Sequence, residues 1–171
     1  MSFIFIKASY SGLDSPLTLN YNSNGVISLQ LPQGPQSDSY YIYLSVNVID
    51  DSDGSTTFTI SSPVQVLPNN NTGIFESILA DKSSSQTILE QLNSGNLNLI
   101  SSTVISLANS LNNQNSFFNF SNDQQALIRK YLMDKLTPLS VSDISSLKVL
   151  SSALSVLTQT YDQVSASLAV N

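Results

Sequence analysis

The sequence predicts an α+β protein in which the strands precede the helices. Apolar residues recur with period two over residues 1–68 and with a period near 3.6 from residue 74 onward. The change falls at the polar stretch Asn-Asn-Asn-Thr-Gly over 69–73, which we interpret as a linker. We therefore expect a β-module over 1–68 and a helical region of four to five short helices over 74–171.

The N-terminal module has the period-two alternation of antiparallel strands, with turn residues between the apolar runs. The six expected strands cover residues 3–7, 17–21, 26–31, 40–50, 56–61 and 63–68. In the longest of them, Tyr40 and Ile42 are expected on one face and Tyr41 on the other. Pro63 and Pro68 suit an edge strand, because proline cannot donate to an inner ladder. Six short strands indicate a β-sandwich of the fibronectin-III or immunoglobulin-like kind.

The C-terminal region has apolar residues spaced by three and four, which predicts an antiparallel helical block. The expected helices cover 74–92, with a break at 83–85 left open, then 97–111, 121–136, 144–157 and a short piece over 162–168. Ser121 followed by Gln124 has the spacing of a capping box. Ser140 or Ser142 is expected to cap the fourth helix, and Asp162 the fifth. Short helices are marginal in water, so these need each other or a sheet face as cover.

Composition excludes several classes of partner. Charged residues make up only 11% of the chain, and six basic against twelve acidic residues leave a formal charge of −6. A net negative chain with scattered basic residues attracts neither nucleic acid nor anionic lipid. No apolar run approaches the roughly 20 residues that span a bilayer, so we expect no membrane insertion within this chain. The opening Met-Ser-Phe-Ile-Phe-Ile is expected to be a strand rather than a signal peptide.

The sequence argues against an enzyme. It contains no His and no Cys, so the usual Ser-His-Asp and Cys-His arrangements cannot form within it. Carboxylate chemistry would need two acids across a cleft. Glu76, Glu90, Asp123 and Asp134 are instead expected at exposed positions of separate helices. We therefore expect no catalytic residues and no cofactor, with calcium as the one alternative.

The only dense acidic cluster is Asp50-Asp51-Ser52-Asp53-Gly54. Oxygen-rich loops of this kind bind Ca²⁺, which makes Asp50, Asp51 and Asp53 the candidate calcium ligands. The cluster does not fit an EF-hand loop, because the acid at loop position 12 is missing. The other interpretation is a hairpin turn, in which Asp and Gly are favoured on backbone grounds.

Two further features concern the surface. Asn70 and Asn119 begin the two N-glycosylation sequons, and both fall in expected loops. Several tyrosines could form an aromatic surface for a glycan or peptide, or could serve cross-strand packing. These are Tyr10, Tyr21, Tyr40, Tyr41 and Tyr43.

Two parts of the chain resemble known modules. Residues 41–54, followed by Phe58 and the Pro-Val-Gln-Val-Leu-Pro exit over 63–68, resemble the closing strands of a PKD-like or REJ (receptor for egg jelly) module, which carry a Y-x-V-x-V-x-D-x-x-G hairpin. The order of 127–136, 154–158 and 162–165 is similar to the stretch between REJ sandwiches and the GAIN domain of polycystin-like proteins. A phrase of the form ALxxLTxxxDxVS recurs there.

The resemblance implies a segment from the extracellular part of a larger polycystin-like membrane protein. The chain has no cysteine and no His-Leu-Thr or His-Leu-Ser triplet, so neither self-cleavage nor channel activity is implied. The expected role is structural or adhesive, and the partners are neighbouring domains of the larger chain or another extracellular protein. The alternatives are a carbohydrate- or calcium-dependent recognition domain, and a secreted subunit that self-assembles through an exposed strand edge.

Overall fold

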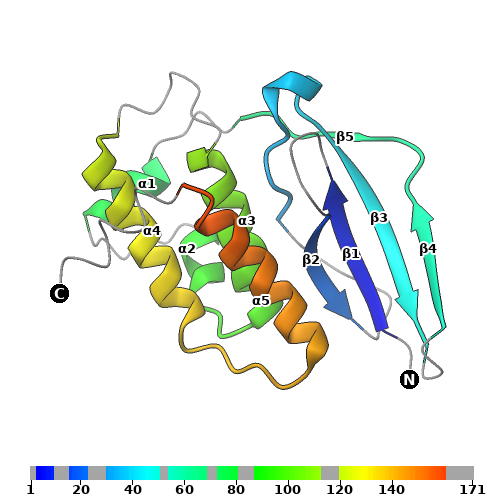
Figure 1. Cartoon of the computed structure of the whole chain (residues 1–171). Coiled ribbons are helices and arrows are strands. Elements are labelled where there is room, and N and C mark those ends of the chain that lie inside the picture. The colour runs from blue at the N-terminus through cyan, green and yellow to red at the C-terminus, as the bar shows by residue number, and fades with distance from the viewer. Residues whose placement is uncertain are drawn as a thin grey trace.

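A computed structural model describes residues 3–9, 16–22, 30–50, 54–68, 73–80, 87–112 and 120–160. An antiparallel sheet of five strands is followed in the chain by helices, which confirms the predicted α+β class. The helices gather on one side of the molecule, and the sheet on the other (Figure 1).

The strands form one sheet in the order β2-β1-β3-β4, and β5 pairs with the start of β3. Their bounds are β1 Phe3–Ser9, β2 Leu17–Asn22, β3 Tyr41–Ile49, β4 Ser55–Thr59 and β5 Val64–Gln65. The central pair joins β1 to β3 from Phe3 opposite Ile49 to Ser9 opposite Tyr43. The short β5 lies at the edge, as its flanking prolines predict.

The sandwich is not confirmed. The described strands make a single sheet, and the layer that packs on it is helical. Most of the expected strand 26–31 lies outside the described residues, and Gln30 and Leu31 at its end have no strand structure. The physical reason for the helical layer lies in β2. Its apolar residues Leu17 and Leu19 are buried because the apolar faces of two helices pack against this strand.

Tyr40 is a correction to the predicted strand 40–50. The 3-10 helix η1 (Gln36–Asp38) ends in a turn in which Ser39 and Tyr40 both have left-handed φ values, 53° and 65°. The Tyr40 amide donates to Pro35 O at 2.9 Å, which closes this turn. The strand therefore begins one residue later, at Tyr41.

The structure describes five helices after the strands, and the break left open at 83–85 lies outside the described residues. Their bounds are α1 Gly73–Leu79, α2 Thr87–Leu92, α3 Leu97–Asn112, α4 Asn122–Leu136 and α5 Ile144–Leu157. Ser121 caps α4 in a capping box, because it accepts from the Gln124 amide and the Gln124 side chain accepts from the Ser121 amide. This confirms the predicted cap.

The predicted cap of α5 is wrong. Asp143, rather than Ser140 or Ser142, accepts from the Ser146 amide at 2.7 Å, and Ser146 Oγ accepts from the Asp143 amide at 3.0 Å. A carboxylate is the stronger acceptor for an amide at a helix N-terminus, where the helix dipole also favours negative charge. The expected cap Asp162 lies outside the described residues.

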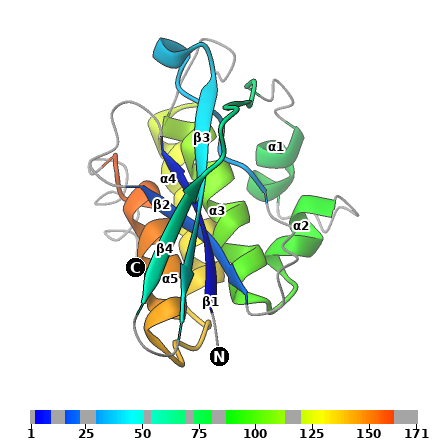
Figure 2. The ribbon, with the colours of Figure 1, turned by 90° about the vertical axis from the view of Figure 1, so that its right-hand side faces the viewer.

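One apolar core joins residues from both sides of the predicted linker. Ala8, Leu17 and Leu19 of the sheet pack with buried side chains of the helices, among them Val104 and Val156. Helices α3 and α5 contact β2, and the sheet extends away from them through β1 and β3 to β4 (Figure 1). In the view turned by 90°, the strands therefore lie in front of these helices (Figure 2). Residues 69–72 lie outside the described ranges, so the division of the chain at 69–73 stays a prediction.

Candidate binding surface

Strand β4, at the outer edge of the described sheet, is exposed along its length. All five residues of β4 are exposed, and β4 pairs with β3 alone among the described strands. Its other edge therefore presents amides and carbonyls that pair with none of the described strands. The Ile60 amide donates to Leu44 O, so by antiparallel alternation the amides of Thr57 and Thr59 point away from β3.

Apolar side chains accompany this edge. Phe58 is 59% exposed and lies opposite Val46, and Ile60 is exposed one position beyond the strand. Natural edge strands are usually protected by charge or proline, but Ser55–Thr59 contains neither. The uncharged Thr-Phe-Thr-Ile run over 57–60 was the sequence signal for this edge, although the sequence analysis assigned the edge strand to residues 63–68 because of Pro63 and Pro68.

Of the five tyrosines that could form an aromatic surface, two lie together on one face of β3. Tyr41 and Tyr43 are 37% and 48% exposed, whereas Ile42 between them is buried. Tyr40 lies in the turn before the strand, and its carbonyl accepts from the Val66 amide at 2.8 Å. Tyr10 and the side chain of Tyr21 lie outside the described residues. The described part of the predicted aromatic surface is thus a pair on one strand.

Asp50 closes the β3–β4 turn. Its amide donates to Gly54 O at 2.9 Å, and its Oδ1 accepts from the Gly54 amide at 2.9 Å. Its carboxylate also lies close to Gly54, since a Cβ there would come within 2.8 Å of Oδ2. Asp51 and Asp53 lie outside the described residues, so the calcium site stays a prediction. Among the described residues, no group of three or more His, Cys, Asp or Glu side chains could hold a metal ion.

The four carboxylates weighed for catalysis lie at exposed positions of α1, α2 and α4. Asp123 and Asp134 occupy the same helix rather than separate ones, about 16 Å apart along its axis at 1.5 Å per residue. Both sequon asparagines, Asn70 and Asn119, lie outside the described residues. In the described ranges, no helix is both long enough and apolar enough to cross a membrane.

Arg129, one of the scattered basic residues of the sequence, is buried, which the sequence did not predict. Its guanidinium donates to Leu157 O at 3.0 Å, to Asn112 Oδ1 at 2.7 Å and to Thr160 Oγ1 at 3.2 Å. Asn112 Nδ2 in turn donates to Val156 O. Arg129 therefore joins the C-terminal ends of α3 and α5, where helix dipoles favour a cation. Burial lowers the pKa of the Arg129 guanidinium. This cluster supports the fold.

The chain matches no protein-family model, no curated protein and no solved structure.

Proposed function

We propose that this chain is a non-catalytic structural or adhesive segment that acts through the open β4 edge of its sheet. The observation that supports this most directly is the exposure of β4 along its whole length beside exposed Phe58 and Ile60. An unpaired strand edge binds an extended segment of a partner by strand addition, in which backbone hydrogen bonds provide affinity and side chains provide specificity.

The other end of the sheet is closed to strand addition. The Thr18 amide of edge strand β2 donates to Ser152 Oγ of α5 at 3.0 Å, and α5 packs along this strand. With one open edge among the described strands, pairing of two copies through β4 forms a closed two-fold dimer rather than a filament. This favours adhesion between two chains over the open-ended self-assembly of a secreted subunit.

The setting that we propose is the outside of a cell. Only 11% of the residues in the chain are charged, and such a composition suits recognition by backbone and hydroxyl groups. The resemblance of residues 41–54 and 127–136 to REJ and polycystin-like sequences favours a larger membrane protein as the parent. The same proposal includes a fibronectin-III or immunoglobulin-like sandwich as the finer fold. The partners that we propose are neighbouring domains of the parent protein or another extracellular protein.

Bead aggregation tests the adhesive function. Beads coated with the chain are expected to cluster, and the soluble chain is expected to sediment as a dimer at high concentration. Thr57→Pro removes one outward amide, and Phe58→Lys adds a charge at the edge, so both variants should disperse the beads. Leu127→Lys is the matched control, because Leu127 is 57% exposed on α4 and receives the same charge. Beads that stay dispersed with the unmodified chain would contradict the proposal.

A second candidate is carbohydrate recognition through Tyr41 and Tyr43. Two residues apart on a strand, their Cα atoms are separated by about 6.8 Å on the same face, so both rings can contact one extended glycan. Titration with neutral oligosaccharides should then show binding that Tyr43→Ala removes.

For the calcium alternative, Ca²⁺ should raise the melting temperature relative to chelator, and Asp51→Ala with Asp53→Ala should abolish that rise.

A further inference from the structure

A cleft of about 370 Å³ lies at one end of the helical block, apart from the β4 edge. The described residues that line it come from 92–100, around the turn between α2 and α3, and from 134–140, at the end of α4. Figure 1 shows the α2–α3 turn and the α4–α5 connection at the same, lower end of the helices. The volume lies within the size range of small-molecule sites.

The base of the cleft is apolar and its rim is polar. The buried Leu92 and Ile100 line it together with the half-buried Leu139. Four further side chains bring an amide, a carboxylate, an ammonium and a hydroxyl group, from Asn93, Asp134, Lys135 and Ser140. An apolar surface beside a few convergent polar groups is the usual composition of a site that binds a small molecule.

Lys135 places its ammonium at the cleft in a fixed position. Its Nζ donates to Asn93 Oδ1 at 2.6 Å and lies 4.9 Å from the centre of the Tyr131 ring. The Asn93 side chain is itself fixed, because its Nδ2 donates to Leu89 O at 2.8 Å. Asn93 is the one hydrogen-bond acceptor of Lys135 among the described residues, so two of the three ammonium donors remain for a ligand.

Asp134 adds a charge of the opposite sign. This residue precedes Lys135 on α4, is exposed, and forms no ion pair with a basic side chain in the described ranges. The charged side chains known to line the cleft therefore balance each other. A ligand with one charge of each sign matches them, whereas a simple anion would face Asp134 and a simple cation would face Lys135.

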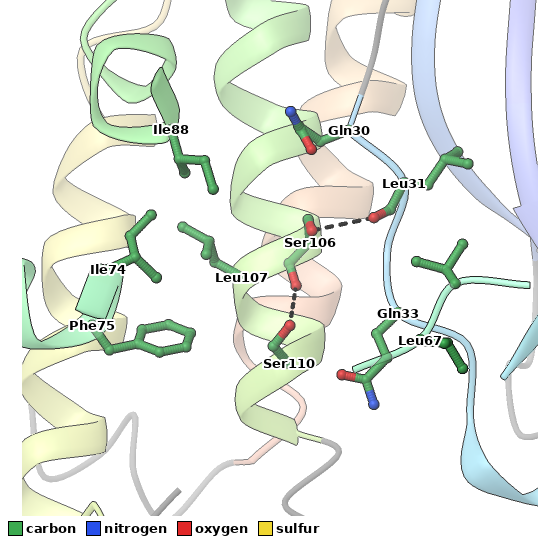
Figure 3. A pocket seen from close by; sticks show the side chains of 11 residues that line it. Gln30, Leu31, Gln33, Leu67, Ile74, Phe75, Ile88, Ser106, Leu107 and Ser110 are labelled. Carbon is green, nitrogen blue, oxygen red and sulfur yellow. Dashed lines mark hydrogen bonds between the residues drawn. The ribbon is translucent and has the colours of Figure 1, made fainter. Parts of the chain in front are cut away.

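The cavity beside α3 offers no comparable site (Figure 3). Gln33 Nε2 has no hydrogen-bond partner among the described residues, but it is buried from solvent, so a ligand cannot reach it. The hydroxyls of Ser106 and Ser110 donate to Leu31 O and to Ser106 O. These hydroxyls serve the fold, whereas the charged groups of the cleft lie at its accessible rim.

We propose that the cleft at the end of α4 binds a free α-amino acid with an apolar side chain. Lys135 donates to the carboxylate of the ligand, and Asp134 accepts from its ammonium. The side chain of the ligand covers Leu92 and Ile100, which removes apolar surface from water. The two charges of an α-amino acid are adjacent, as Asp134 and Lys135 are on α4.

Four matched probes test the proposal on the whole chain. L-Leucine has both charges and an apolar side chain, 4-methylpentanoate lacks the ammonium, 3-methylbutylamine lacks the carboxylate, and glycine lacks the side chain. In ¹H–¹⁵N NMR titrations at about pH 7, where both groups of leucine are charged, leucine is expected to shift the Asn93 side-chain amide and the Gly95 amide saturably. The Thr57 amide on β4 should not shift.

Each incomplete probe should bind more weakly than leucine. Loss of either charge should weaken binding about fivefold, the contribution of one ion pair near solvent. Glycine should bind about tenfold more weakly, because it buries no apolar side chain.

Two variants assign the charges to their residues. Lys135→Met removes the partner of the carboxylate, so leucine and 3-methylbutylamine should then bind with similar affinity. Asp134→Asn removes the partner of the ammonium, so leucine and 4-methylpentanoate should then bind with similar affinity. The matched controls are Lys130→Met and Asp123→Asn, which change the same charges on α4 outside the cleft and should leave leucine binding unchanged.

The four probes decide the matter on the unmodified chain, even where a variant fails to fold. Absence of a saturable shift with leucine at millimolar concentrations would overturn the proposal. Equal affinity for leucine and either singly charged probe would overturn the zwitterionic class of ligand. Neither result bears on the β4 edge, which bead aggregation tests separately.

Discussion

The amide of Thr18 in β2 donates to Ser152 Oγ in α5 at 3.0 Å, across 134 positions of sequence. The same hydroxyl donates to Lys148 O one turn earlier in its helix. Near these residues, the Lys148 ammonium lies 5.2 Å from the centre of the Phe5 ring, a cation–π contact. Helix α5 thus covers the backbone of an edge strand that would otherwise be open, and attaches the helical block to the sheet.

Ser152→Ala is expected to lower the free energy of unfolding by about 1 kcal/mol, because the Thr18 amide loses its acceptor in a partly buried position. Alanine also favours the helix slightly more than serine does. Ser151→Ala, at an exposed position of the same helix, has that propensity gain alone and serves as the control. Urea unfolding of both variants should show only Ser152→Ala destabilised. Equal stabilities would mean that the hydrogen bond contributes nothing.

Arg129→Met should destabilise the chain by about 2 to 4 kcal/mol, because Leu157 O and Asn112 Oδ1 would lose charge-assisted donors in a buried site. Arg129→Lys should recover only part of this loss, since one ammonium cannot reproduce the planar fork of a guanidinium. Lys130→Met, at the adjacent and less buried position, is expected to change stability by less than about 0.5 kcal/mol. If thermal unfolding shows the same stability for Arg129→Met and Lys130→Met, the buried hydrogen bonds of Arg129 do not stabilise the fold.

Asp143 links stability to pH. The hydrogen bond from the Ser146 amide lowers the pKa of the Asp143 carboxyl below its ordinary value. A lowered folded-state pKa gives stability that is present above the unfolded pKa and is lost as pH falls through the folded value, here below about pH 4. Asp143→Asn keeps an acceptor at the cap but cannot titrate, so its deficit relative to the unmodified chain should be present at pH 6 and vanish in acid.

Free energies of unfolding of both chains, measured from about pH 6 to about pH 2, check this, because that interval spans the ordinary pKa of a carboxyl group. Asp134→Asn, in the last turn of α4, removes one negative charge elsewhere and controls for the change in net charge. A deficit of Asp143→Asn that stays constant in acid would show that the carboxylate charge is not what stabilises the cap.

Gly34→Ala is expected to cost more than about 2 kcal/mol. An added Cβ would overlap the Tyr40 carbonyl and lie 2.8 Å from Tyr40 Cα, and backbone cannot move aside as a flexible side chain can. Gly95→Ala provides the comparison, because Gly95 has a φ of 70° but open space around it, so only the left-handed conformation is penalised, at about 1 kcal/mol. Denaturant unfolding that ranks Gly95→Ala as the more harmful change would contradict the close approach of Gly34 to Tyr40.

The sequence by itself determined the elements that depend on local patterns. Alternation of apolar residues predicted β1, β3 and β4, and spacing by three and four predicted the helices from α1 to α5. The Ser121 capping box was readable because its two partners are three residues apart, so the interaction is complete within one turn of helix.

Only the tertiary structure decided which surfaces meet. The sequence could not show that helices rather than a second sheet cover β2, since either layer buries Leu17 and Leu19 equally well. The burial of Arg129 depends on Asn112 and Leu157, 17 and 28 positions away, and the open edge of β4 depends on which strands lie beside it. Hydrophobic burial is not directional, so a local pattern specifies that a face must be covered but not by which partner.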